Sequence, residues 1–244
     1  MTAPHHAIAN RYGSDGDKQA YLRSLFDRGA AHYDRISGFG FLWTGGFYRR
    51  RCLRLAGLRP GMNVLDVACG TGAVSRACLD VLRGNGTVVG VDPSPGMLGV
   101  ARRRVAGAQF VEGHAEMLPA ADASVDFVTM GFALRHVAQL ERAFGEYRRV
   151  LRSGGRVLLV EISRPRTRPG LVLARIYFRD VLPRLTRLVT GSEDARKMMD
   201  YYWETIDACV PPESILAALR SVGFEHVQRR TELGICSAYT ATAP

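Results

Sequence analysis

The sequence has few of the features that mark membrane-spanning, zinc-binding or secreted proteins. No run of about 18 consecutive apolar residues occurs, so no membrane-spanning helix is expected. The five cysteines are odd in number and form no C-x-x-C pair, which argues against a zinc site or a disulfide framework. The first residues also lack the apolar core of a secretory signal. We therefore expect a cytoplasmic protein without a metal.

Lysine is scarce as well. Only Lys18 and Lys197 contribute to the 33 basic residues, so arginine supplies nearly all of the positive charge behind the formal net charge of +10. A basic surface can serve nucleic acid or an anionic membrane, but these arginines are spread along the chain. The pattern favours an ordinary solvated surface. We expect no nucleic acid as a partner, and we leave peripheral membrane contact and a homodimer open.

The 244 residues suffice for one α/β domain with a sizeable core. Strands and helices alternate over most of the chain, which predicts right-handed crossovers and a doubly wound, mostly parallel, Rossmann-like sheet. The expected strands are 63–67, 87–92, 108–111, 125–131 and 156–162, with a terminal hairpin at 224–231 and 234–240. The expected helices are 18–34, 47–57, 73–83, 95–105, 139–151 and 212–221.

Two segments fall outside this alternation. Residues 1–17 are rich in small and polar residues, and we expect them to be flexible. Residues 164–210 contain prolines and aromatic-rich helical stretches, and an insertion of this length before the hairpin is well placed to form a substrate lid. We expect a single domain over 18–244, with N-terminal helices over 18–57.

A buried strand runs into a glycine-containing loop between Val64 and Gly72. Gly70 and Gly72 allow a tight turn and a close approach of the backbone to a ligand at the sheet edge. Asp92 ends the next strand, where a carboxylate can accept hydrogen bonds from a ribose diol. A dinucleotide would need a third glycine where Ser75 stands, and a nucleoside triphosphate would need G-K-[ST], which is absent.

Asp66, the acidic residue directly before this loop, distinguishes between cofactors that carry a pyrophosphate and those that carry a positive charge. A carboxylate there repels pyrophosphate but attracts a cationic amino-acid moiety. Together with the two glycines and Asp92, it points to S-adenosylmethionine as the cofactor and S-adenosylhomocysteine as its product. The residues therefore predict a methyltransferase.

Several segments resemble known methyltransferase motifs. Residues 66–72 resemble motif I of class I methyltransferases, and residues 146–161 resemble their late helix–turn–strand segment. Residues 26–34 resemble the F-D-x-x-A-x-x-Y-D opening of the ubiquinone/menaquinone biosynthesis C-methyltransferases (UbiE/MenG type). Residues 132–137 resemble the F-G-[LI]-R-N-[VL] motif of the same enzymes. The likeness covers residues 22–240 and implies C-methylation of a hydrophobic phenol, hydroquinone or quinone-type acceptor.

The motifs and the resemblance together define the expected site residues. Cofactor contacts are expected from the loops that follow the first four strands: Asp66, Ala68, Gly70, Thr71, Gly72, Asp92, Pro93, Met97, His114, Ala115 and Gly131. Contacts with a small hydrophobic aromatic acceptor are expected from the opening motif, the segment after the fourth strand and the lid: Tyr33, Phe132, Arg135, His136, Tyr177, Tyr201, Tyr202 and Trp203.

The chain departs from the family pattern chiefly on the acceptor side. His136 replaces the usual Asn beside Arg135, and His114 replaces Asn or Asp beside the adenine. Residues 202–206 read Y-W-E-T-I where the family usually reads Y-L-P-E-S-I. These differences indicate an acceptor that need not be a respiratory quinone precursor. Methylation of oxygen or nitrogen in a specialised aromatic metabolite, a cofactor-dependent cyclase or regulator, and a nucleic-acid methyltransferase are the alternatives.

Methylation of a ring carbon needs a group that takes the phenol proton and a cation that stabilises the phenolate. We expect Arg135 to be the cation, His136 the base, and Tyr33 to orient the hydroxyl. Adjacent residues in a strand point in opposite directions. If one of the pair points away, we expect His136 in the pocket and Arg135 paired with a carboxylate.

Overall fold

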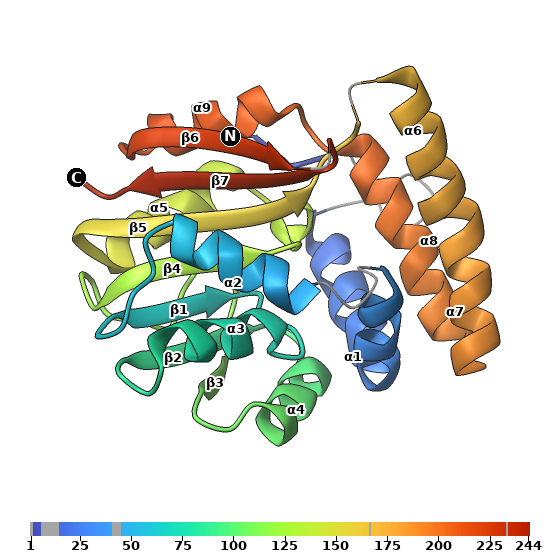
Figure 1. The fold of residues 1–244 in the computed structure, drawn as a ribbon, viewed down its shortest axis with the longest axis horizontal. Coiled ribbons are helices and arrows are strands. Elements are labelled where there is room, and N and C mark those ends of the chain that lie inside the picture. Colours follow the sequence, from blue (N-terminus) through green and yellow to red (C-terminus); the bar gives the residue numbers. More distant parts are fainter. Residues whose placement is uncertain (1, 6–14, 41–44, 166, 233) are drawn as a thin grey trace.

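The computed structural model describes residues 2–5, 15–40, 45–165, 167–232 and 234–244. Its strands are β1 (Asn63–Val67), β2 (Thr87–Asp92), β3 (Gln109–Glu112), β4 (Val125–Gly131), β5 (Leu151–Ile162), β6 (Glu225–Glu232) and β7 (Cys236–Thr242). They form a seven-stranded sheet in the order β3-β2-β1-β4-β5-β7-β6 (Figure 1). Strands β1 to β5 are parallel, and β7 runs antiparallel to both β5 and β6. The doubly wound, mostly parallel sheet with a terminal hairpin is thus confirmed.

The helices alternate with the strands, and a group of them then lies in the segment 164–210, for which a lid role stays a prediction and which we call the lid. They are α1 (Asp15–Gly40), α2 (Gly45–Leu55), α3 (Ala73–Leu82), α4 (Pro95–Arg104), α5 (Leu140–Val150), α6 (Arg168–Arg175), α7 (Leu182–Thr190), α8 (Glu193–Ala208) and α9 (Pro212–Ser221). A 3-10 turn, η1 (Leu134–His136), follows β4, and a π-helical stretch, η2 (Ile176–Val181), joins α6 to α7. None of the helices in the described ranges is long and apolar enough to cross a membrane.

Alternating side chains of the central strands build the core on both faces of the sheet. Val64 packs in one cluster with Cys78 of α3, whereas the next residue, Leu65, packs in a second cluster with Phe144 of α5. This follows from the two-residue period of a strand. Both faces are covered, by α2 and α3 on one side and α5 and α9 on the other (Figure 1). The middle of the sheet is therefore mainly apolar, as in residues 157–160 of β5.

Helix α1 and the lid helices lie beyond the carboxyl ends of the parallel strands (Figure 1). Helix α1 packs against α8 and α4. A Cβ at Gly29 would lie 2.9 Å from Sδ of Met198, so a glycine is needed for this close approach. On the other side, Asp27 accepts hydrogen bonds from Oγ of Ser94 at 2.5 Å and from the backbone N–H of Gly96 at 2.9 Å. Its carboxylate thus fixes α1 to the N-terminus of α4.

Two elements differ most from the prediction. Helix α1 continues to Gly40 instead of ending at residue 34, and β5 begins at Leu151, five residues before the predicted start at 156. The early part of β5 pairs irregularly with β4, where the register shifts between Val125 and Phe127. A break in pairing of this kind interrupts the regular pattern by which strands are recognised.

The N-terminal segment, residues 1–17, is not flexible throughout as expected. The backbone N–H of Thr2 donates to Glu141 of α5 at 2.6 Å, and His5 is only 4% exposed. Helix α1 covers the end of the segment, and residues 6–14 lie outside the described residues. The sequence of this segment gives no sign of this order, because it depends on Glu141 of α5, a residue distant in the chain.

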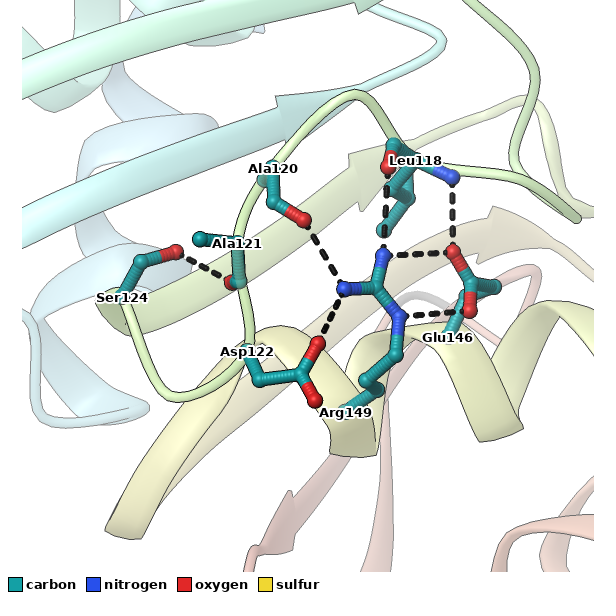
Figure 2. Close-up of polar contacts among 7 residues, drawn as sticks. All are labelled: Leu118, Ala120, Ala121, Asp122, Ser124, Glu146 and Arg149. Atoms are coloured by element: carbon teal, nitrogen blue, oxygen red, sulfur yellow. Dashed lines mark hydrogen bonds and ion pairs between the residues drawn. The ribbon is translucent and has the colours of Figure 1, made fainter.

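An arginine in α5 organises the long connection between β3 and β4. Figure 2 shows Arg149 donating to the carbonyls of Leu118 and Ala120, at 3.1 and 2.8 Å, and to the carboxylates of Glu146 and Asp122. Glu146 in turn accepts the backbone N–H of Leu118 at 2.8 Å. One guanidinium with several donors can satisfy all these acceptors. The cluster holds the loop whose beginning, at residues 113–116, lines the cavity described next.

Candidate active site

A cavity lies at the carboxyl ends of β1, β2 and β4, between the sheet and the helices α1, α2, η2, α7 and α8. Its floor comes from the loops that leave these strands, and its roof comes from side chains of the helices. The strand order reverses between β1 and β4, with β2 and β3 on one side and β5 on the other. Ligands of open α/β sheets bind at such a switch point.

In the loop after β1, backbone atoms that no side chain covers line the cavity. Ala68, Gly70 and Gly72 have positive φ angles of 53°, 54° and 84°. Nothing lies within 4 Å of the position of a Cβ at Gly70, which lines the cavity together with Ala68 and Thr71. Gly72 does not line it; a Cβ there would lie 2.8 Å from Cγ2 of Val105. One glycine therefore leaves room for a ligand, and the other allows α3 and α4 to pack closely.

Asp92 joins two of the loops that form the floor. Its carboxylate accepts the backbone N–H of Gly70 at 2.8 Å and that of Ser94 at 2.9 Å. Burial raises the pKa of Asp92 to about 6, although both hydrogen bonds act to lower it. Each carboxylate oxygen has a further lone pair, so the residue retains the capacity to accept the two hydroxyls of a ribose.

Asp66 lies near the end of β1 and does not line the cavity. It is fully buried and accepts a hydrogen bond from the hydroxyl of Ser75 at 2.6 Å. Burial raises its pKa to about 7, and Oδ1 has no hydrogen-bond partner among the described residues. The expected direct contact with a cofactor cation is therefore absent from this geometry. The unpartnered buried oxygen nevertheless fits a cofactor that carries a positive group.

The remaining expected cofactor residues, Pro93, Met97, His114, Ala115 and Gly131, all line the cavity. At Gly131 a Cβ would lie 2.6 Å from Cγ2 of Val74. The side chain of Val74 thus occupies the space beside Gly131.

The backbone leaves strand geometry directly after β4. Phe132 has a φ of 61°, and the 3-10 turn η1 follows. A positive φ at a bulky residue is strained and is found chiefly at functional sites. The turn sends the side chains of Arg135 and His136 to different places: His136 lines the cavity, and Arg135 does not.

Arg135 is completely buried and forms an ion pair with Glu161 at the end of β5. Its Nε donates to Oγ1 of Thr205 at 3.0 Å, and its guanidinium carbon lies 4.1 Å from the ring centre of Tyr202. Burial acts to lower the pKa of Arg135, but the attraction of Glu161 and Tyr202 raises it above its ordinary value. The expectation that Arg135 faces the acceptor is wrong for this geometry, whereas the alternative, an arginine paired with a carboxylate, is what the structure has.

His136 presents an imidazole to the cavity. Its ring stacks on Tyr201 at 5.7 Å and meets the edge of Phe26 at 5.3 Å. Nδ1 is buried and has no hydrogen-bond partner among the described residues. Burial lowers the pKa of His136 well below 6.5, and the charge of Arg135 lowers it further. The ring is therefore neutral at pH 7 and has a free nitrogen to accept a proton.

Two arginines line the cavity, Arg23 of α1, which pairs with Glu112, and Arg49, and the sequence analysis singled out neither. Arg49 of α2 lines the cavity, with its guanidinium carbon 5.8 Å from the ring centre of Phe132. Burial lowers its pKa, and the hydroxyls of Tyr33 and Tyr202 act in the opposite direction. In the sequence Arg49 is the first of three consecutive arginines, and no local signal separates it from Arg50 and Arg51.

The lid aromatics divide into two layers. Tyr202 lines the cavity, as does Tyr33 of α1, whereas Tyr177, Tyr201 and Trp203 do not. Tyr201 stacks behind His136, and Trp203 lies parallel to Phe178 at 6.4 Å. Phe178, Leu182 and Met199 then form an apolar part of the wall that the sequence did not predict in detail. Three expected substrate residues thus pack against residues that line the cavity and do not line it themselves.

A family comparison agrees with this arrangement of strand ends and loops. The model of the ubiE/COQ5 methyltransferase family matches residues 15–243. The chain belongs to this family. It is an S-adenosylmethionine-dependent methyltransferase of class I fold, as the motifs predicted. No group of three or more His, Cys, Asp and Glu side chains that could hold a metal ion occurs in the described part of the chain.

Two sequence relatives are methyltransferases of quinone biosynthesis by name. This methyltransferase is 34% identical over 219 residues to the demethylmenaquinone methyltransferase of Symbiobacterium thermophilum, covering 86% of this chain and 87% of the relative. It is 35% identical to the ubiquinone/menaquinone biosynthesis C-methyltransferase UbiE of Ectopseudomonas mendocina, covering 87% and 84%.

Two solved structures share the fold. One is a methyltransferase of Thermotoga maritima described as a possible histamine N-methyltransferase, with a TM-score of 0.64, 20% identity and coverage of 91% of this chain and 99% of the neighbour. The other is the [4+2]-cyclase SpnF, with a TM-score of 0.58, 18% identity and coverage of 82% and 80%. One fold thus carries different chemistries, so the acceptor must be inferred from the cavity.

Proposed function

We propose that this methyltransferase transfers a methyl group to a ring carbon of a hydrophobic hydroquinone or related phenol. The observation that carries the proposal is a cavity lined by an imidazole, whose buried Nδ1 has no partner among the described residues, and by a partly buried guanidinium. His136 supplies the nitrogen and Arg49 the guanidinium. The names of the curated relatives, which include demethylmenaquinone methyltransferase, support the same class of acceptor.

The cofactor residues follow from the floor of the cavity. Asp92 accepts the ribose hydroxyls, and the backbone of Gly70 and Thr71 approaches the amino-acid end of the cofactor. His114 and Ala115 border the adenine. S-adenosylmethionine, when bound, supplies an activated methyl group for an in-line displacement, so the contribution of the protein is mainly orientation and activation of the acceptor.

Activation requires that a ring hydroxyl lose its proton, because the phenolate pushes electron density onto the ortho and para carbons. Nδ1 of His136 takes this proton, because the ring is neutral at pH 7. Burial also makes the ring a weaker base, so the transfer needs a cation beside the developing phenolate. Arg49 stabilises the negative oxygen, a role in which a guanidinium stays charged even when partly buried. This replaces Arg135, which serves instead to hold Tyr202 in place. After the ring carbon has gained the methyl group, it loses its own hydrogen as a proton to solvent, which restores the aromatic ring.

Tyr33 and Tyr202 complete the polar part of the wall. Burial raises the pKa of both hydroxyls above its ordinary value. Both phenols therefore stay protonated at neutral pH and act as hydrogen-bond donors to an acceptor oxygen, not as bases. The apolar residues of the lid exclude water from the same space and favour a hydrophobic ring or side chain.

The test is turnover with saturating S-adenosylmethionine and a short-chain naphthohydroquinone. We expect His136→Ala to lower the rate by about 10²- to 10⁴-fold, the usual contribution of a proton-transfer group. Arg49→Gln should lower it by about 10²-fold, the low end for loss of one charge-stabilising donor. Matched controls are the exposed His226→Ala on β6 and Arg50→Gln on α2, whose side chain is 35% exposed and pairs with Asp80 outside the cavity. Both should retain full activity.

The product decides between the proposed reaction and its alternatives. With a ¹³C-labelled methyl donor, the carbon chemical shift separates C-methylation from O- or N-methylation. A C-methyl product that both variants lose would support the proposal. An O- or N-methyl product, or variants that turn over within a few-fold of the wild type, would contradict it. No S-adenosylhomocysteine with any phenolic acceptor would favour the cyclase or regulator alternative.

A further inference from the structure

The outward side of the lid combines exposed apolar and basic side chains in an unusual way. We define the outer lid face by the exposed residues of α6, η2 and α7: Arg168, Val172, Leu173, Arg175, Ile176, Arg179, Val181, Arg184, Arg187 and Leu188. In Figure 1 these helices lie at the margin of the molecule, away from the sheet.

The apolar members of this face are strongly exposed. Leu188 is 83% exposed, Leu173 68% and Val172 56%. Single exposed apolar residues are normal, but a series of them on one pair of consecutive helices marks a surface that contacts something apolar. The spacing of Val172, Arg175, Ile176 and Arg179 places them together, because residues three and four apart share one side of a helix.

The charge of the face has one sign. Between residues 168 and 190 the sequence has five arginines and one carboxylate, Asp180, so the stretch carries a net charge of +4 (5 − 1). Asp180 lies 3.9 Å from the guanidinium of Arg184 and balances that residue alone. A basic, amphipathic stretch with large aliphatic residues is typical of helices that lie in the interface of an anionic membrane.

The opposite side of the same helices faces the acceptor. Phe178 of η2 and Leu182 at the start of α7 line the cavity, while Arg179 and Val181 beside them are exposed. One layer of helix therefore separates the cavity from the outer lid face. A π-helical stretch such as η2 is rare and tends to occur at functional sites, and here it lies between the two surfaces.

We propose that the outer lid face docks onto the surface of an anionic phospholipid bilayer. Its arginines contact lipid phosphates, and its valine, leucine and isoleucine side chains enter the region between headgroups and acyl chains. The proposal goes beyond the reaction, because it assigns a site of action to the enzyme whichever atom is methylated. A second copy of the chain is a less suitable occupant, because two faces of the same charge would repel each other.

The test is co-sedimentation of the full chain with vesicles, either of pure phosphatidylcholine or of phosphatidylcholine with a quarter of phosphatidylglycerol. We expect binding to the anionic vesicles, weak binding to the neutral ones, and release by salt, which screens the charges. Two double variants probe the two contributions separately: Arg175→Gln with Arg179→Gln, and Leu173→Ser with Leu188→Ser. Each should lower the partition coefficient at least about tenfold.

Matched controls use the same substitutions elsewhere. Arg59→Gln with Arg103→Gln removes two exposed arginines far from the lid, and Leu55→Ser alters an exposed leucine of α2. Both should bind anionic vesicles as the wild type does. The proposal is overturned if the wild type stays in the supernatant, or if the controls lose as much binding as the lid variants. A dimer in sedimentation velocity that Leu173→Ser with Leu188→Ser dissociates, without vesicle binding, would identify a second copy as the occupant.

Discussion

Replacing Arg135 tests whether this residue stabilises the fold or acts directly on the methyl acceptor. Arg135 and Glu161 have side-chain exposures of 0% and 1%. Arg135→Met would leave the Glu161 carboxylate buried without its partner and would also remove the hydrogen bond to Thr205. Breaking such a pair costs roughly 3–5 kcal/mol. Because a domain is stable by only about 5–15 kcal/mol, we expect a large fall in the free energy of unfolding.

The double variant Arg135→Met with Glu161→Gln tests the cause of that loss. With both charges removed, the penalty of a lone buried carboxylate disappears, and we expect most of the lost stability to return. Arg152→Met is the control for a surface pair, since Arg152 and Asp126 are 44% and 26% exposed. It should cost less than about 1 kcal/mol.

The assay is urea unfolding at pH 7, followed by circular dichroism, with turnover measured on the same samples below the transition. If Arg135→Met lost less than about 1 kcal/mol while turnover fell by about 100-fold with bound cofactor unchanged, the guanidinium would act on the acceptor, and our assignment of Arg49 and Arg135 would have to be reversed. If the double variant were no more stable than the single one, the buried carboxylate would not be the cause.

Two further predictions concern the cofactor half of the cavity. Asp92→Asn should weaken S-adenosylmethionine binding, measured by calorimetry, roughly 30- to 150-fold, as expected for about 2–3 kcal/mol from a lost charge-assisted contact. Because burial raises the pKa of Asp92 to about 6 in the free protein, the affinity of the wild type should fall as the pH drops below 6, and this pH dependence should vanish in the variant. Gly131→Ser should lower the free energy of unfolding by about 1–3 kcal/mol, because the new Cβ would lie 2.6 Å from Cγ2 of Val74, and adding Val74→Ala should restore it. If the single and the double variant had the same melting temperature, the contact with Val74 would not be the cause of the loss.

Local features of the sequence were enough to predict the cofactor half of the site. The apolar strand 63–67, the two glycines and the carboxylate at the end of the next strand lie within 30 residues of one another. Their arrangement follows from strand periodicity and from the rule that parallel strands end at one edge of the sheet. The strand bounds at β1, β2 and β4 therefore agree with the prediction.

The acceptor half was decided by tertiary structure. Whether Arg135 or His136 faces the cavity depends on the positive φ of Phe132 and on a carboxylate from another strand, Glu161. Neighbouring residues in sequence offer no signal for either. The same holds for Arg49, which lines the cavity only because α2 packs across the face of the sheet that holds Phe132. Side-chain direction at the end of a strand is a property of long-range packing, and motif spacing records only which residues are near the site.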